Sequence, residues 1–332
     1  MPVTVVPRPS IEPQLHPSSF QFIDVGVNLS DPVFRGSYRG KQRHEDDMED
    51  MLQRSKAAGV VSQIITGTSL RESQEAAALA KRFGLYFTIG CHPTRVAEFD
   101  RHKGGPQAYL DALEKLISAN LKGKGRVVAV GECGLDYDRL HFASEEVQRK
   151  YFRIQLALAR KYNLPLFLHD FVKILREEGF AENDKALGVV HSFTGTPEEA
   201  IELMDMGFHL SVNGCSLKTE DNLRAAKTIR PERILLETDA PWCSMTGGHA
   251  SKEHLASLPQ SLRDVYFPPA ARPEQFTTGK AVKGRNEPCA IGGVAWVIHK
   301  LHGVPFDKVV AKAFKNTCEL FGLDDIEPNS PS

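Results

Sequence analysis

The chain has 332 residues, and its 41 basic and 42 acidic side chains give a formal charge of −1. This balance excludes a polycation that holds nucleic acid by bulk charge, so a nucleic-acid role needs local contacts or a metal. No apolar run approaches the roughly 20 residues that cross a bilayer, so no membrane span is expected. Six scattered cysteines, with no C-x-x-C pair and no secretory leader, predict reduced thiols in an intracellular protein of the cytoplasm, the nucleus or both.

The length fits either one large α/β barrel, which commonly takes roughly 250 residues plus insertions, or two smaller domains. Residues 1–20 are rich in proline and poor in apolar side chains, which predicts a flexible N-terminal tail. Residues 21–323 are expected to form the folded domain, and residues 324–332 a C-terminal tail.

From residue 22 onward, short apolar runs alternate with helical patterns. Strands are expected at 22–28, 60–66, 85–89, 127–132, 165–169, 188–191, 209–212 and 234–239. Helices are expected at about 45–58, 70–83, 109–117, 144–162, 171–178, 197–207, 221–228, 291–301 and 306–321, with a loop at 242–284. This alternation indicates parallel strands, and eight of them favour a closed (β/α)₈ TIM barrel over an open doubly wound sheet.

Four of these strands end in a side chain that can bind a metal: Glu132, His169, His191 and Asp239. In a parallel barrel all strand ends of one rim face a single cavity, so residues far apart in sequence can share one ion. Two carboxylates and two imidazoles suit Zn²⁺, Mn²⁺ or, with more water, Mg²⁺. The pattern therefore predicts a metal site.

Each of these residues also has a simpler explanation. Glu132 could pair with Arg139, either histidine could be a hydrogen-bonded core residue, and Asp239 could cap the turn that follows it. Four such residues at equivalent strand ends favour the metal site, because chance would scatter them between the two rims.

Two further strand ends are weaker candidates. His92, in a tight Gly-Cys-His-Pro turn, could contact a phosphate or a metal-bound water. Asn28 and Asp24 could contribute oxygen ligands, although Asp24 could equally bond a local backbone amide.

Seven ordered motifs resemble the TatD family of metal-dependent deoxyribonucleases, over about residues 22–323. They are FIDVGVNL at 22–29, GCHP at 90–93, VGECGLD at 130–136, FLH at 167–169, VHSFTGT at 190–196, LETDAPW at 236–242 and RNEP at 285–288. Residues 213–219 and Trp242 look like the eukaryotic TatD-like branch.

The resemblance implies a TIM-barrel hydrolase of the amidohydrolase superfamily. Such an enzyme would cut DNA, single-stranded or at 3′ ends, as a 3′–5′ exonuclease with one or two divalent ions, often Mg²⁺. The family's metal ligands correspond to Glu132, His169, His191 and Asp239, the same residues that the strand ends select.

Two departures from the family pattern stand out. Gly26 and Asn28 replace a His-x-His pair on the first strand, as in the TatD-like subgroup, so one of two metals would be held weakly. A short stretch of the rim after His169 is missing relative to the family, which removes an arginine suited to a substrate phosphate.

The expected mechanism is phosphodiester hydrolysis with Glu132 and Asp239 as catalytic residues. A metal on Glu132, His169 and His191 would activate water and polarise a phosphate oxygen, and Asp239 would orient or deprotonate that water.

The phosphate contacts are expected from His92 and from Lys283 or Arg285 of the late loop, with Asn28 as a further substrate-binding residue. Two alternatives remain open. One is a hydrolase of a small amide or lactone, and the other is a non-catalytic binding protein whose shortened rim has disabled the site.

Overall fold

The computed structural model describes residues 16–169, 175 and 187–326. The helix expected at 171–178, except for residue 175, and the shortened segment after His169 lie outside these residues, as does most of each expected tail. The described ends of both tails pack on the domain. Phe20 is buried with its ring 4.7 Å from that of Phe306, and Asp325 forms an ion pair of 3.0 Å with Arg126. The folded unit therefore extends beyond the predicted 21–323 on both sides.

Eight parallel strands form one sheet in chain order. The strands are β1 (Phe22–Val27), β4 (Val60–Ile65), β5 (Tyr86–Ile89), β6 (Val127–Gly134), β7 (Leu166–His169), β8 (Gly188–Val190), β9 (His209–Val212) and β10 (Ile234–Leu236). The backbone N–H of Asp239 donates to Gly26 at 2.9 Å, and that of Asn28 donates to Ala240 at 2.7 Å. These bonds join the last strand to the first, which confirms the predicted (β/α)₈ barrel.

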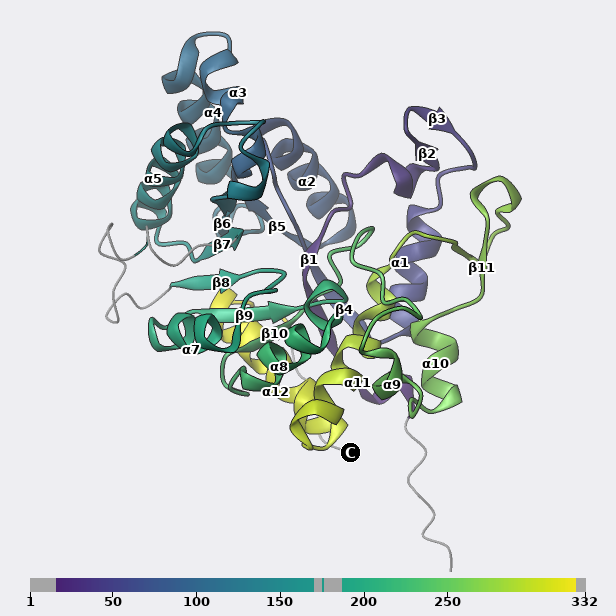
Figure 1. Ribbon diagram of the computed structural model, residues 1–332. Coiled ribbons are helices and arrows are strands. Elements are labelled where there is room, and N and C mark those ends of the chain that lie inside the picture. Colours follow the sequence, from purple (N-terminus) through teal and green to yellow (C-terminus); the bar gives the residue numbers. More distant parts are fainter. Residues whose placement is uncertain (1–15, 170–174, 176–186, 327–332) are drawn as a thin grey trace, which may run out of the picture.

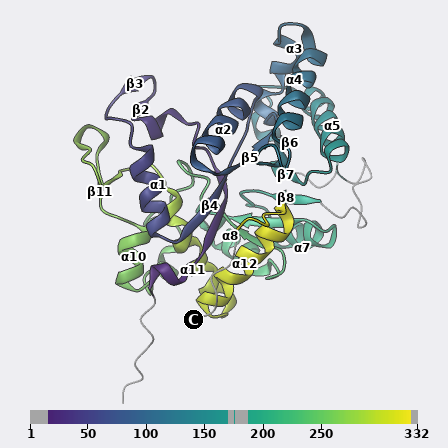
Figure 2. The same ribbon diagram turned by 180° about the vertical axis from the view of Figure 1, so that it is seen from behind.

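Helices surround the strands on the outside (Figures 1 and 2). They are α1 (Met48–Ala57), α2 (Leu70–Phe83), α3 (Ala97–Arg101), α4 (Gly105–Asn120), α5 (Glu145–Tyr162), α7 (Pro197–Asp205), α8 (Glu220–Thr228), α9 (Lys252–Leu255), α10 (Gln260–Tyr266), α11 (Ile291–His302) and α12 (Phe306–Phe321). Helix α7 begins with a capping box, in which Thr196 and Glu199 each accept a hydrogen bond from the other's backbone N–H. Among the described residues, none of these helices has the length and apolar character that a bilayer crossing requires.

The segment predicted as loop at 242–284 contains two of these helices, α9 and α10. The side chains of Leu258, Leu262 and Tyr266 are buried at a spacing of four residues, which is a helical repeat that the surrounding prolines obscure. Two strand pairs add to the loops: β2 (Ser37–Tyr38) with β3 (Lys41–Gln42), and β11 (Ala270–Ala271) with β12 (Ala281–Val282). Short 3₁₀ turns occur at Pro17–Ser19, Pro32–Arg35, Pro93–Arg95, Tyr137–Arg139, Cys215–Leu217, Pro273–Gln275 and Pro288–Ala290.

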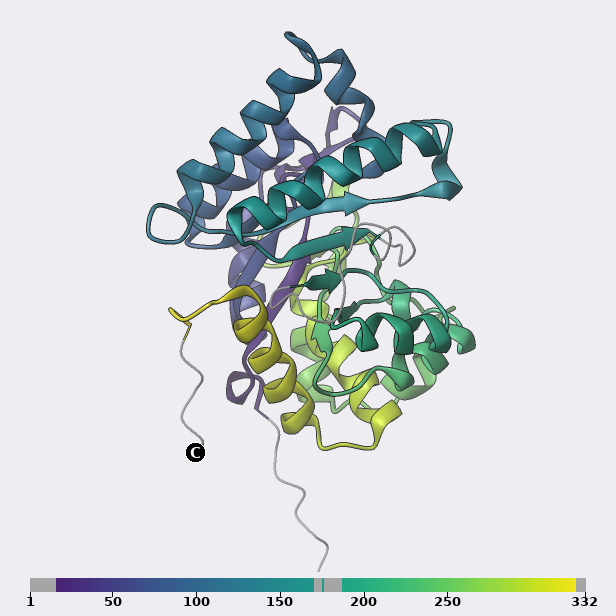
Figure 3. The same cartoon turned by 90° about the vertical axis from the view of Figure 1, so that its left-hand side faces the viewer.

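Apolar side chains fill the barrel and close one of its ends. Ile23 and Val25 of β1 and Phe167 of β7 belong to one buried cluster with Phe314 and Phe321 of α12. Just after α12, Asp325 meets Arg126, the residue before β6, so the end of α12 lies at the N-terminal ends of the strands. In Figure 3, α4 and α5 (blue to teal) lie above the strands and α12 (yellow) lies below them. The C-terminal rim is therefore the open end of the barrel, where enzymes of this fold carry their sites.

Candidate metal centre

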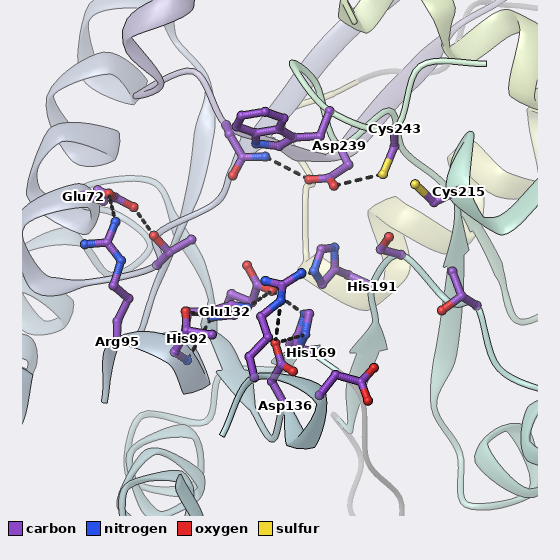
Figure 4. Close-up of a pocket in the computed structure, with 18 of the residues that line it drawn as sticks. Glu72, His92, Arg95, Glu132, Asp136, His169, His191, Cys215, Asp239 and Cys243 are labelled. Atoms are coloured by element: carbon purple, nitrogen blue, oxygen red, sulfur yellow. Dashed lines mark hydrogen bonds and ion pairs between the residues drawn. The ribbon is translucent and has the colours of Figure 1, made fainter. Parts of the chain in front are cut away.

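The C-terminal ends of the strands surround a cavity of about 940 Å³. Six of the residues selected from the sequence line it, and each lies at or near the C-terminal end of a different strand: Asn28, His92, Glu132, His169, His191 and Asp239. Figure 4 shows the carboxylate of Glu132 between three of these side chains, His92, His169 and His191. The barrel thus brings together residues that lie up to 211 positions apart.

One oxygen of Glu132 is the centre of the arrangement. Its Oε1 atom lies 2.9 Å from Nδ1 of His169, 2.9 Å from Nε2 of His191 and 3.3 Å from Nε2 of His92. The side chain of Glu132 is 7% exposed, so water does little to stabilise its charge. The imidazoles are its partners, and the alternative pairing with Arg139 does not occur.

The charges of this cluster are strongly coupled. Burial of Glu132 opposes its ionisation, but the nearby His92 and His191 and the hydrogen bonds from His169 and His191 hold its pKa well below the usual range. Burial likewise opposes the charged form of His169, yet its hydrogen bonds to Asp136 and Glu132 raise its pKa to about 9. The pKa of His191 is raised well above its ordinary value against the effect of burial, by Glu132 and then Glu237. The site thus has an ionised carboxylate at its centre, which is stabilised by positive charge around it.

The carboxylate of Glu237, the residue after β10, lies on the other side of the His191 ring. Oε1 of Glu237 lies 3.5 Å from Nδ1 of His191, a buried nitrogen that has no hydrogen bond within the described part of the chain. Glu237 is fully buried and is held by the Ser192 N–H at 2.8 Å and by the Ser211 hydroxyl at 2.6 Å. The amide of Asn213 donates to it as well, at 2.8 Å. A carboxylate behind a ligating imidazole fixes the ring and its tautomer.

Glu237 was not singled out from the sequence. The available signal was its place after Leu235 and Leu236, because an acidic residue that continues a buried strand needs partners. Asp136 was also missed, although it follows Glu132 by four residues. Its Oδ2 lies 3.5 Å from Nε2 of His169 and 3.4 Å from Nε of Arg139. It therefore supports His169 as Glu237 supports His191.

Asp239 faces the same cavity but stands apart from the imidazole cluster. Its Oδ1 accepts a hydrogen bond from Nδ2 of Asn28 at 2.8 Å, and its Oδ2 accepts one from the Cys243 thiol at 3.3 Å. Within the described residues, no hydrogen bond or ion pair joins Asp239 to Glu132 or to a histidine. Burial raises the pKa of Asp239 to about 6, although His191 lowers it. This carboxylate can orient a water or accept its proton near neutral pH.

The first strand supplies space and support at the site. A Cβ at Gly26 would lie 2.8 Å from Oε2 of Glu237, so glycine at this position leaves room for that buried carboxylate. Asp24 is fully buried and accepts from the backbone of Gly26 and Thr238, at 3.3 and 2.9 Å, outside the cavity lining. Asp24 therefore bonds backbone amides, which is the second of the two roles considered for it from the sequence.

Two predicted phosphate contacts do not lie in the cavity. The prediction for Arg285 is wrong, because its side chain is 1% exposed and its guanidinium donates to Asp47 at 2.7 and 2.5 Å and to Glu287 at 2.8 Å. Lys283 is exposed next to β12 and is not part of the cavity lining. Of the two, Arg285 is held in place by buried ion pairs with Asp47 and Glu287.

The donors present fit a divalent cation. His92, Glu132 and His169 each offer one ligand atom, and these three atoms lie within 4.8 Å of one another. Nε2 of His191 points at the same Glu132 oxygen. Mixed imidazole and carboxylate donors of this kind bind Zn²⁺ and Mn²⁺, and with additional waters Mg²⁺.

A parallel barrel with imidazoles and carboxylates gathered at its C-terminal rim is an arrangement of metal-dependent hydrolases. The chain belongs to the TatD related DNase family, whose model matches residues 23–322. This assignment confirms the resemblance seen in the seven motifs.

Three similar proteins illustrate the relationship. Deoxyribonuclease Tat-D of Schizosaccharomyces pombe is 42% identical over 91% of this chain and 96% of its own. The 3′-5′ ssDNA/RNA exonuclease TatD of Erwinia amylovora is 32% identical over 90% of this chain and 99% of its own. A crystal structure of an uncharacterized amidohydrolase from Saccharomyces cerevisiae superposes with a TM-score of 0.82 at 32% identity, covering 91% of this chain and all of that one.

Proposed function

We propose that the protein is a divalent-metal-dependent deoxyribonuclease that removes nucleotides from the 3′ ends of single-stranded DNA. The observation that carries the proposal is the convergence of three imidazoles on one oxygen of Glu132 in a cavity that also holds Asp239. The names of the S. pombe and E. amylovora relatives support the reaction and the substrate.

Glu132, His169 and His191 would hold the cation with Asp239 beside it, and His92 would serve as a further ligand or a phosphate contact. When bound, a divalent cation lowers the pKa of a water and neutralises phosphate charge. Mg²⁺ is the proposed ion, with Mn²⁺ or Zn²⁺ as alternatives and one or two ions in the site.

Asp239 is the proposed general base. Its carboxylate accepts hydrogen bonds from Asn28 and Cys243, and it forms no ion pair with the histidines within the described residues. With a pKa raised to about 6 by burial, it is ionised at neutral pH and still basic enough to take a proton from water. In this proposal Asn28 mainly positions the carboxylate of Asp239 and does not mainly bind the substrate.

The arginines of the cavity replace Lys283 and Arg285 as the proposed phosphate contacts. Arg95 is already paired with Glu72 at 2.8 Å and with Glu98 at 3.3 Å. Arg139 is 55% exposed and has one long pair, 3.4 Å, with Asp136. Arg71 is exposed in the cavity and forms no ion pair with any residue that the structure describes. Arg71 and Arg139 are therefore the cations most available to a phosphate.

We also propose that the protein acts inside the cell. The six cysteines are all free thiols, in accordance with a reducing compartment. Fractionation of cells followed by immunoblotting separates the cytoplasmic and nuclear pools from a secreted one.

The test is an exonuclease assay on 5′-labelled single-stranded DNA with Mg²⁺. The wild type should produce a ladder that shortens from the 3′ end, and Glu132→Gln and Asp239→Asn should each lower the rate by about 10³-fold. Asp324→Asn is the matched control, because its carboxylate is 77% exposed near the closed end of the barrel, and it should retain the wild-type rate. Wild-type rates in both site variants, or turnover of cyclic amides in place of DNA, would refute the proposal.

A further inference from the structure

Trp242 is an exposed aromatic side chain in the wall of the catalytic cavity. Five large apolar side chains of the described residues are exposed: Val61, Leu140, Phe142, Ile201 and Trp242. Of these, Trp242 alone lines the cavity, and it is the most exposed of the five at 55%. An indole left open to water at the mouth of a polar cavity is an unused contact surface.

The backbone beneath Trp242 is fixed from both sides. Its N–H donates to the carbonyl of Asp239 at 2.9 Å, and the carbonyl of the buried Pro241 accepts from the Asn286 N–H at 3.0 Å. The Asn286 side chain also donates to Thr238, at 2.9 Å. The indole therefore stands at a defined place three residues from the proposed general base, which lowers the entropic cost of binding a partner.

The indole face has no partner among the residues that the structure describes. No aromatic ring stacks on Trp242, no cation lies over it and its N–H makes no hydrogen bond there. The second tryptophan shows the contrast: Trp296 is 6% exposed, packs against His299 and Phe306, and donates to Ser257. Trp296 is a core residue, whereas the face of Trp242 is available to a ligand.

The other groups of the cavity indicate what that ligand is. Arg71 and Arg139 line the same cavity, and both are exposed. An aromatic face beside cations and a proposed cation site matches a nucleotide, whose base stacks while its phosphate meets the positive charges. A small amide or lactone would not use both features.

We propose that Trp242 is the stacking platform for a base next to the scissile phosphate at the 3′ end of the substrate. This inference rests on the proposed function and adds the element that selects single strands. Every base has a π face, so the platform tolerates any sequence. A base in a duplex is already stacked and paired, and it must leave the helix before it reaches the indole.

The first test compares the wild type and Trp242→Ala on two substrates, an oligonucleotide with all of its bases and one that lacks the 3′-terminal base. On an ordinary oligonucleotide, Trp242→Ala should lower kcat/KM by roughly 10- to 100-fold, and Trp242→Phe should retain most of the activity. On an oligonucleotide whose 3′-terminal nucleotide lacks its base, the wild type and Trp242→Ala should have nearly equal kcat/KM. Phe142→Ala is the matched control, because Phe142 is 52% exposed but lies outside the cavity lining, and it should match the wild type. An equal loss on both substrates, or no loss on either, would overturn the proposal.

A second readout does not depend on cleavage. The chain has two tryptophans, so Trp296→Phe leaves Trp242 as the only indole. In this variant, combined with Asp239→Asn to prevent turnover, oligothymidylate should quench the fluorescence of Trp242, and a fluorescence unchanged at saturating oligonucleotide would contradict stacking. If the wild type fails to cut DNA, the proposed function fails while this titration still decides whether Trp242 binds a base.

Discussion

The carboxylate of Glu237 lies 3.5 Å from Nδ1 of His191, while Nε2 of the same ring lies 2.9 Å from Glu132. The imidazole is thus oriented between two acidic side chains from different strands. Conserving the shape of Glu237 but removing its charge, as in Glu237→Gln, should lower divalent-metal affinity by about 10- to 100-fold. Calorimetric titration with Mn²⁺ measures this loss. Glu232→Gln is the control, because Glu232 is exposed just before β10. Equal Mn²⁺ affinities in the two variants would show that Glu237 does not support the metal centre.

The buried carboxylate of Glu237 is expected to need the space that glycine leaves at position 26. In Gly26→Ala the new methyl group would lie 2.8 Å from Oε2 of that carboxylate and 3.5 Å from the ring of Phe167. Overpacking at such a site costs about 1–3 kcal/mol in the free energy of unfolding, and displacement of Glu237 should weaken metal binding as well. Urea unfolding and Mn²⁺ titration check the two effects. Gly247→Ala should change neither quantity, because a Cβ at Gly247 meets nothing within 4 Å. A Gly26→Ala variant with the stability and Mn²⁺ affinity of the wild type would contradict the prediction.

Arg285 is expected to stabilise the fold, and Lys283 is expected to do little. Arg285→Met removes the buried guanidinium and leaves Arg54 as the remaining cation, 3.4 Å from Asp47 and 2.8 Å from Glu287. The free energy of unfolding should therefore fall by about 3 kcal/mol, the lower end of the range for a broken buried pair. Lys283→Ala should leave both the stability and the KM for single-stranded DNA at wild-type values. Chemical unfolding monitored by circular dichroism gives the first quantity and the exonuclease assay the second. A raised KM in Lys283→Ala would restore this residue as a phosphate contact.

His209 should make the protein less stable in acid. Burial, followed by the nearby Arg233, lowers the pKa of His209 from 6.5 to about 4. The folded state therefore disfavours the protonated ring, so the stability associated with the neutral form is complete above pH 6.5 and is lost as the pH falls toward 4.

The comparison with His209→Asn isolates this effect. Unfolding free energies of the two proteins should differ little at about pH 8, and the difference should shift by roughly 2–3 kcal/mol against the wild type by about pH 4. Parallel pH profiles for the two proteins would show that His209 does not titrate differently on unfolding.

The sequence predicted the barrel and the cavity residues because both depend on local patterns. An apolar run that ends in Glu132 or His169 places the polar side chain at the end of a strand, and eight parallel strands bring such ends to one rim. Pairings between distant segments were not predictable in this way. Arg285 looked like a free cation because nothing near it in sequence shows that Asp47, 238 residues away, accepts two of its hydrogen bonds.

The supporting residues show the same limit. Glu237 lies two positions before Asp239, yet its role depends on His191, Ser211 and Asn213, which meet it only after the sheet has formed. Helix α10 was overlooked because prolines before and after it resembled a loop, while its buried side chains are recognised as one face only once their surroundings are known.

The metal centre is tested most directly by locating Mn²⁺ in a crystal from its anomalous scattering. We expect a peak at about 2.0–2.3 Å from Oε1 of Glu132 and from ring nitrogens of His169 and His191. The peak should vanish in crystals of Glu132→Gln grown under the same conditions. A folded, Mn²⁺-soaked protein with no peak at these three side chains, or with an unchanged peak in Glu132→Gln, would contradict the proposed metal centre.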